Sequence, residues 1–165
     1  LLNVELQVFL DKKDYEGAMT NMLKASEREP NNPLYLYNIG YLYHKEKKDV
    51  AKGIEFYEKA LVADPNYADA LYMRGLIFVD ESNTVVESMN KLTRSPADQK
   101  KWEELDKKKK TLLASAIPYF EKSYKVNRED LATLDALREV YYKTERMEEA
   151  LRVKREADAI RANKR

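Results

Sequence analysis

Acid–base chemistry or metal binding would have to come from very few side chains in this sequence. There is one histidine, His44, and no cysteine, so thiolate sites and histidine-rich metal sites are excluded. The carboxylate pairs Glu103–Glu104 and Glu148–Glu149 are adjacent in sequence, so the members of each pair point about 100° apart on a helix and do not converge. We therefore predict a protein that is not an enzyme, with no catalytic residue, no bound metal and no cofactor.

Charge patterning is the next source of functional chemistry. The 165 residues contain 30 Lys and Arg against 29 Asp and Glu, which gives a net charge of +1. A run of four lysines follows an acidic stretch, and we expect intrahelical ion pairs four residues apart: Glu103 with Lys107, Glu104 with Lys108, and Asp106 with Lys110. The balanced charge and these spacings predict that the chain does not bind nucleic acid.

Twelve tyrosines are the most distinctive part of the composition. Five of them share a helical stripe with aliphatic residues and are expected in the core: Tyr15, Tyr43, Tyr57, Tyr124 and Tyr141. Tyr37, Tyr41 and His44 lie at spacings of four and three on the opposite face of one helix, where their side chains form a line. Tyrosine offers contact area and a polar hydroxyl, which suits it to anchoring a partner, although such rings also cover neighbouring helices. Both roles stay open, and we favour the binding surface.

The elements that carry these residues are predicted to be helices throughout. Helix formers dominate and only four glycines and five prolines interrupt them, which predicts an all-α chain. The longest stretch without a charge, 30–44, contains prolines and asparagines, so no membrane span is expected. Apolar periodicity and stop signals place eight helices, at residues 2–11, 15–28, 33–45, 50–63, 68–92, 96–126, 131–143 and 147–163.

The predicted helices recur with an internal period. Gly75 follows Gly40 by 35 residues, and apolar residues around the two glycines occupy matching positions. Small residues recur where two helix backbones must approach closely: Gly40, Gly75, Ala18, Gly53, Ala116 and Ala150. The period is that of stacked antiparallel helix pairs.

This pattern resembles the tetratricopeptide repeat family. The best copy has the family's order of large, small and aromatic residues in Leu36, Ile39-Gly40, Tyr43, Gly53, Tyr57, Ala60 and Pro65. The resemblance implies one solenoid domain over residues 1–165, an α–α superhelix with repeats at about 1–30, truncated at its amino end, 33–66, 68–128 and 131–163. The third copy is split by an insertion at about 79–115, and the fourth has Arg138 where the family has glycine.

In this family the first helix of each pair lines a concave groove, and the resemblance implies that the groove binds a partner. Its lining here would be Tyr37, Asn38, Tyr41, His44, Asp69, Tyr72, Asp135, Glu139 and Tyr142. We therefore expect an interaction scaffold that holds a peptide or helix of another protein. The alternative is an assembly module that uses the solenoid ends or the inserted hairpin, which would make the partner a larger complex or, in a homo-oligomer, a second copy of the chain.

The insertion is expected to be helical. Thirty-eight positions separate Phe78 from Ala116, whereas ten separate Tyr43 from Gly53, which leaves about 28 additional residues. Apolar spacing continues on both sides of a capped helix start at Ser95-Pro96-Ala97-Asp98. The sequence therefore predicts a long antiparallel helical hairpin.

Two residues of this hairpin carry sharper expectations. Trp102 is expected to pack near Met89 or Leu92 inside the hairpin. Pro118 has no amide hydrogen for the carbonyl of Ala114, so we expect a kink or break over 114–118 that acts as a hinge.

The split repeat is also similar to helical-repeat proteins of Bacteroidetes bacteria, many of them exported. That similarity favours an extracytoplasmic, periplasmic setting, with the cytoplasm as the alternative, because the absence of cysteine is compatible with both. No signal peptide is visible, and since the chain begins at Leu1 within an expected helix, we expect that a preceding segment was removed.

Overall fold

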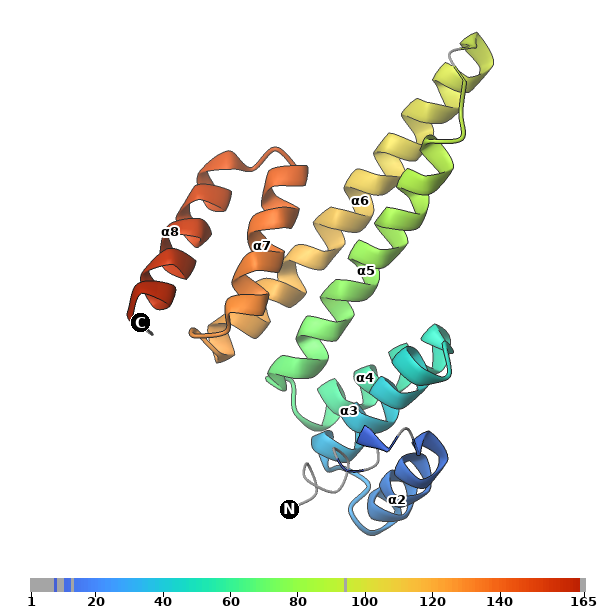
Figure 1. The fold of residues 1–165 in the computed structure, drawn as a ribbon, viewed down its shortest axis with the longest axis vertical. Helices are drawn as coiled ribbons and strands as arrows, with labels where there is room; N and C mark the ends of the chain where they lie inside the picture. The colour runs from blue at the N-terminus through green and yellow to red at the C-terminus, as the bar shows by residue number, and fades with distance from the viewer. Residues whose placement is uncertain (1–7, 9–10, 13, 94, 164–165) are drawn as a thin grey trace. The chain divides into compact units, whose positions relative to one another are not determined.

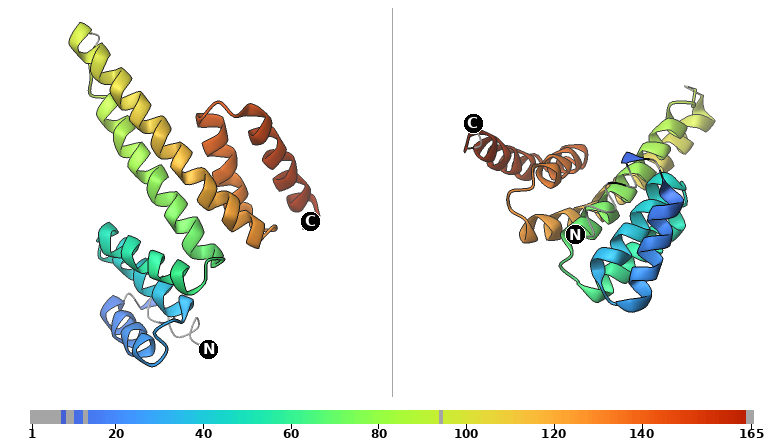
Figure 2. Two further views of the ribbon diagram at one scale, coloured as in Figure 1. Left: turned by 180° about the vertical axis from the view of Figure 1, so that it is seen from behind. Right: turned by 60° about the horizontal axis from the view of Figure 1, so that its bottom comes forward.

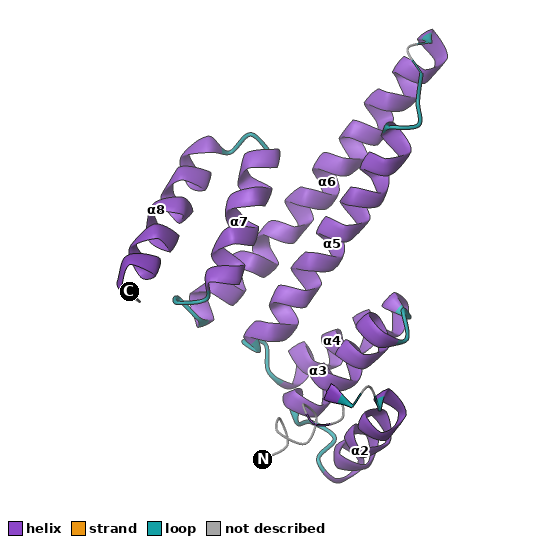
Figure 3. Ribbon diagram, in the orientation of Figure 1, coloured by secondary structure: helices purple, strands orange, loops and turns teal. Residues whose placement is uncertain are grey.

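The computed structural model describes residues 8, 11–12, 14–93 and 95–163, and over these residues the fold is all-α, as predicted, with no β-strand (Figures 1 and 3). Seven α-helices are complete in this part of the chain, against about eight predicted, because the first predicted helix, 2–11, lies mostly outside the described residues. The elements are α2 (Tyr15–Arg28), α3 (Pro33–Tyr41), the π-helical turn η1 (Leu42–Glu46), α4 (Val50–Ala63), α5 (Ala68–Met89), α6 (Pro96–Val126), α7 (Leu131–Lys143) and α8 (Met147–Asn163).

Short polar side chains fix where most of these helices begin. Each accepts a hydrogen bond from a backbone amide in the first helical turn, which satisfies a donor that the helix itself leaves unpaired. Ser95, for example, accepts from the amide of Asp98 at 3.1 Å, and Pro96 follows it as the first residue of α6. The side chains with this role are Asp14, Asn32, Asp49, Ser95 and Asp130.

The chain divides into two compact units, Leu1–Ala70 and Leu71–Arg165, with the boundary in the first turn of α5. The single domain expected from the sequence therefore stays a prediction. In the first unit α3 packs against both α2 and α4. Its core is built from α2, α3 and η1: Ala18, Met19, Met22, Tyr35, Ile39 and Leu42.

The sequence predicts one continuous helix over 33–45. In the structure the α-helix ends at Tyr41 and continues as the π-helical turn η1. Ile39 and Gly53 are 14 positions apart, whereas the equivalent Leu137 and Ala150 are 13 apart. The additional residue is taken up by η1, in which the amide of Lys47 donates to the carbonyl of Leu42, five residues back, at 3.0 Å. A single π-helical turn therefore keeps the glycine of α4 in register with α3.

In the second unit, α5 and α6 lie side by side and antiparallel, and they extend beyond the shorter pair α7 and α8 (Figures 1 and 2). Helix α7 packs against α6, and α8 packs against α7. Ring contacts join α5 to α6, with centroid distances of 5.7 Å for Tyr72–Phe120 and 5.8 Å for Phe78–Tyr119. Farther along α5, Val85 and Met89 are buried, as the apolar spacing of the predicted hairpin required.

Pro118 does not break its helix, so the break expected over 114–118 is wrong: α6 is continuous from Pro96 to Val126, and the kink and hinge expected there stay predictions. The pyrrolidine ring and Ala114 are both exposed. Because the carbonyl that loses its partner belongs to the exposed Ala114, water can satisfy it, and the neighbouring Ile117, Ala116 and Phe120 hold the helix by packing.

Trp102 borders the same hollow as Met89 and Leu92, which agrees with the expected packing inside the hairpin. Its side chain is nevertheless 43% exposed. The indole therefore covers the end of the hairpin without being enclosed by it, because the two helices are separated there only by the short connection 90–95.

We predict that Gly75→Ala destabilises the protein by about 2 kcal/mol, because the added Cβ would lie 2.5 Å from the Phe120 ring, which is fully buried. Urea unfolding measures the loss. Ala132→Leu, on the exposed face of α7, is the control and should change the unfolding free energy by less than about 0.5 kcal/mol. A neutral Gly75→Ala would show that the helix spacing in this pair is not set by the glycine.

Candidate binding surfaces

Four tyrosines of the first unit form a cluster around Tyr37. Its ring centroid lies 6.4 Å from that of Tyr41, one turn along α3, 5.8 Å from Tyr57 on α4, and 5.6 Å from Tyr67 in the turn before α5. Tyr57 is fully buried, whereas Tyr37, Tyr41 and Tyr67 are partly exposed. The cluster therefore combines one buried ring, Tyr57, with three partly exposed rings, and Tyr37 contacts all of the others.

The hydroxyls of Tyr37, Tyr57 and Tyr67 are held neutral. Burial raises the pKa of Tyr37 and Tyr57 well above the ordinary value, and the Asp69 carboxylate adds to the effect at Tyr37. Burial and the charge of Asp69 also raise the pKa of Tyr67 to about 12. Each phenol stays a hydrogen-bond donor at neutral pH, so the surface offers rings for stacking and hydroxyls for polar contacts.

Two of the expected lining residues, Asn38 and His44, are buried, and so differ from the open groove positions that the sequence predicted. His44 lies edge-on to Tyr57, with ring centroids 6.0 Å apart and its Nδ1 3.4 Å from the phenol oxygen. The π-helical turn accounts for this, because it places the His44 Cβ 2.7 Å from where a side chain on Gly53 would begin. Asn38 is 5% exposed, and its amide nitrogen has no hydrogen-bond partner among the described residues.

The other expected lining residues belong to the second unit, apart from Asp69, which is exposed in the first turn of α5. Tyr72 is half-buried on Phe120, and burial, with the charges of Asp130 and Asp135, raises its pKa. Asp135 accepts a hydrogen bond from Arg161 of α8 at 2.6 Å. On α7, Glu139 forms an ion pair with Lys143 at 2.6 Å, and Tyr142 is 65% exposed. The charge of Asp135 acts on Tyr72, so these two side chains of α5 and α7 lie near each other, and a common surface that also includes Glu139 and Tyr142 stays a prediction.

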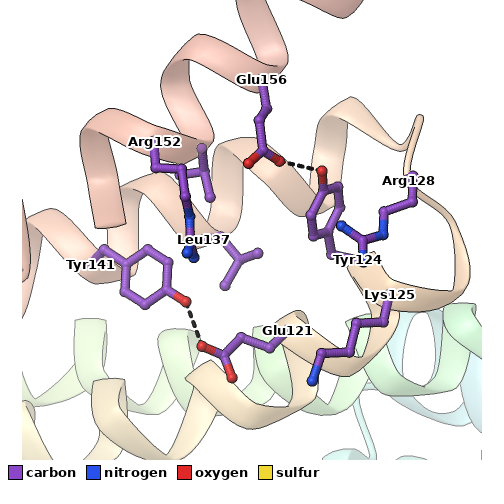
Figure 4. A pocket seen from close by; sticks show the side chains of 9 residues that line it. Glu121, Tyr124, Lys125, Arg128, Leu137, Tyr141, Arg152 and Glu156 are labelled. Carbon is purple, nitrogen blue, oxygen red and sulfur yellow. Dashed lines mark hydrogen bonds between the residues drawn. The ribbon is translucent and has the colours of Figure 1, made fainter. Parts of the chain in front are cut away.

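A hollow of about 290 Å³ lies among α6, α7 and α8 (Figure 4). The Tyr141 hydroxyl donates to Glu121 at 2.5 Å, and the Tyr124 hydroxyl donates to Glu156. Arg152 extends from α8 between the Tyr141 ring and Leu137. The two carboxylates that line the hollow, Glu121 and Glu156, are thus bonded to phenols, and these bonds join α6 to α7 and to α8.

The expected core tyrosines divide into two groups. Tyr57 and Tyr141 are fully buried, while Tyr15, Tyr43 and Tyr124 pack against the cores and stay partly exposed. The sequence reading missed the place of Tyr67 in the cluster. The only signal for it was an aromatic residue three positions after Asp64, in a turn where no helical period applies.

Two absences hold for the part of the chain that the structure describes. No group of three or more His, Asp or Glu side chains is placed to hold a metal ion there. None of the described helices is long and apolar enough to cross a membrane.

The raised tyrosine pKa values predict alkaline destabilisation. The neutral phenols contribute stability that is fully present below pH 10 and is lost as the pH rises through about 12, because unfolded tyrosine ionises at its ordinary pKa of 10.0 while folded Tyr67 stays neutral until about pH 12. Urea unfolding over this range should show the decline. Tyr67→Phe should make it shallower, whereas Tyr142→Phe, whose ring is exposed, should not; equal curves for all three proteins would contradict the burial of this cluster.

Sequence comparison identifies repeats in the first part of the chain. Residues 7–47 match a family described as TPR repeat, and residues 34–67 match the tetratricopeptide repeat. The chain is also similar to the TPR repeat-containing protein MJ1428 of Methanocaldococcus jannaschii, with 30% identity over 145 residues, 83% of this chain and 25% of that protein. The chain thus spans about a quarter of the length of the curated relative that it matches.

Among solved structures, the chain is similar to that of MamA, with 21% identity, a TM-score of 0.42 and coverage of 96% of this chain and 95% of that one. YrrB, described as a TPR protein with an unusual peptide-binding site, gives 20% identity, a TM-score of 0.43 and coverage of 94% and 82%. PilW, described as a type IV pilus biogenesis factor, gives 17% identity, a TM-score of 0.44 and coverage of 96% of this chain and 77% of that one. The family matches identify residues 7–67 as tetratricopeptide repeats, and in the described part of this range α3 packs against both α2 and α4.

Proposed function

We propose that this protein is a non-enzymatic interaction module, and that the tyrosine cluster of its first unit binds an extended peptide segment or helix of another protein. The observation that carries the proposal is the cluster around Tyr37, whose ring contacts the buried Tyr57 and the partly exposed Tyr41 and Tyr67. Rings fixed in this way lose little conformational entropy when a partner covers them, which is the usual property of an interface anchor.

Polar groups on the rings support a peptide as the ligand. The hydroxyls of the partly exposed Tyr37 and Tyr67 stay neutral, so they can donate hydrogen bonds to peptide carbonyl or carboxylate oxygens.

We extend the proposal to the second unit, where Tyr72, Asp135, Glu139 and Tyr142 would form a further surface of the same kind. Its carboxylates are balanced by Arg161 and Lys143, so this surface is mixed in charge. We also propose that α5 and α6 are a third repeat lengthened by the insertion at about 79–115. The likeness to exported bacterial repeat proteins stays a prediction.

The second candidate function is an assembly module that joins copies of the chain or larger complexes through the α5–α6 hairpin. Trp102 favours it, because a large aromatic ring that is 43% exposed at the end of a projecting hairpin is typical of contact surfaces. The two functions use different residues, so one protein can have both.

The peptide proposal is tested by selecting binders from a phage-displayed library of random peptides and measuring their affinity by calorimetry. We expect Tyr37→Ala and Tyr41→Ala each to weaken binding by about tenfold, because each removes one accessible ring. Tyr37→Phe keeps the ring and should lose less than Tyr37→Ala.

Val62→Ala is the matched control, since Val62 is 84% exposed on α4 and does not touch the cluster. Circular dichroism verifies that every variant keeps its helices. Peptides that bind the alanine variants and the wild type equally, or that lose affinity equally for Val62→Ala, would refute the tyrosine cluster as the site.

A further inference from the structure

In the second unit, the outer face of α6 carries a line of exposed side chains: Trp102, Glu103, Lys107, Lys110, Thr111, Ala114 and Pro118. Three hollows follow one another there, and each shares at least one lining residue with the next: Trp102 joins the first two, and Lys110 and Ala114 join the second and third. The last hollow ends at the α7–α8 turn, where Thr144 and Arg146 line it together with Pro118. From Trp102 to Ile117 this outer face is about 24 Å long at about 1.5 Å per residue.

Charge is distributed along this face in two opposite halves. The segment Glu103-Glu104-Leu105-Asp106 is acidic, and the next four residues, 107–110, are all lysines. Only part of this charge is neutralised within the helix: Lys109 and Lys110 bond Asp106 at 2.5 and 3.1 Å. The expected pairs of Glu103 with Lys107 and Glu104 with Lys108 are not formed; Glu103 instead accepts from Gln99 at 3.0 Å.

A helix whose first half is acidic and whose second half is basic is complementary to an antiparallel copy of itself. With a two-fold axis between residues 106 and 107, Glu103 faces Lys110 of the second copy, and Asp106 faces Lys107 of the second copy. Each of these contacts occurs twice by symmetry. Parallel alignment would instead place like charges opposite each other.

The length of the outer face agrees with the same axis. Helix α6 begins at Pro96, and the α7–α8 turn borders the face near Ile117. The midpoint between these two residues is again 106/107, which is where the charge changes sign. When the second copy is centred there, the first residue of its α6 lies opposite Ile117. The second helix therefore ends where the α7–α8 turn begins.

Trp102 has a matching place in this arrangement. The axis sets it opposite Thr111 of the second copy, beside Ala114. Both of these side chains are small and exposed, and they line a hollow of about 480 Å³ on the outer face. An indole that is 43% exposed in one chain would therefore be covered by the other.

We propose that this protein forms a two-fold symmetric homodimer in which the outer faces of two α6 helices pack antiparallel, with the acidic half of each on the lysine half of the other and Trp102 at both ends. This interface is independent of the proposed peptide surface, because it uses no residue of the first unit. Its failure and the failure of peptide binding are therefore separate results.

The test compares two charge-reversed variants, alone and mixed. One carries Glu103→Lys with Asp106→Lys, which makes the face basic throughout, and the other carries Lys107→Glu with Lys110→Glu, which makes it acidic. Light scattering over a concentration series measures mass, and fluorescence reports on Trp102, which is the only tryptophan in the chain.

We expect the wild type to dimerise with a blue shift of its emission. Each variant alone should dimerise at least about tenfold more weakly, and an equimolar mixture should recover both the mass and the blue shift, because every contact is again between opposite charges. The matched control, Lys154→Glu with Arg155→Glu on exposed positions of α8, should associate like the wild type. Circular dichroism establishes that all variants are helical.

Three results would overturn the proposal: a wild type that stays monomeric at every concentration, reversed variants that associate as tightly as the wild type, or a mixture of folded variants that fails to recover the dimer. Trp102→Ala gives a second criterion. It keeps all charges, and the dimer should weaken at least about tenfold with it if the indole is covered at the interface.

Discussion

Close approach of two helices over a glycine is the constraint on which the rest of this structure depends. A Cβ at Gly40 would lie 2.9 Å from the Tyr57 ring, and one at Gly75 would lie 2.5 Å from the Phe120 ring. In both units a fully buried aromatic side chain of the second helix occupies the space that a side chain on the first would need. This contact sets the distance between the helices of a pair, and it decides which face of the first helix is left for other contacts.

The candidate surface follows from that arrangement. Because Tyr57 fills the space against Gly40, its ring also forms a rigid base for Tyr37, which lies 5.8 Å away on the next turn of α3. Tyr41 and Tyr67 contact the Tyr37 ring, and burial keeps the phenol of Tyr67 neutral. The Tyr57 side chain therefore serves both roles considered for the tyrosines: it packs in the core, and it supports the ring of Tyr37 that we propose binds a partner.

The helices could be predicted from the sequence where a local signal is decisive. Ser95 with Pro96 marks the start of α6, and the apolar period continues unchanged to Val126. Pro118 was misjudged because a lost hydrogen bond is cheap on an exposed face, and exposure depends on tertiary packing. His44 was misplaced because one additional residue before Gly53 creates the π-helical turn, which rotates the residues within it. Tyr67 lies in a turn, where neither helical nor strand periodicity gives a side chain's direction.

The central claim, that the Tyr37 cluster is a surface for peptides, is tested most directly by watching the rings themselves. Carbon–proton NMR spectra of protein labelled on tyrosine, recorded during titration with a selected peptide, resolve each ring. The account predicts saturable shifts for Tyr37, Tyr41 and Tyr67, with Tyr124 unchanged because it packs against the core of the second unit. A peptide that binds and shifts Tyr124 while the three cluster rings stay constant would contradict it.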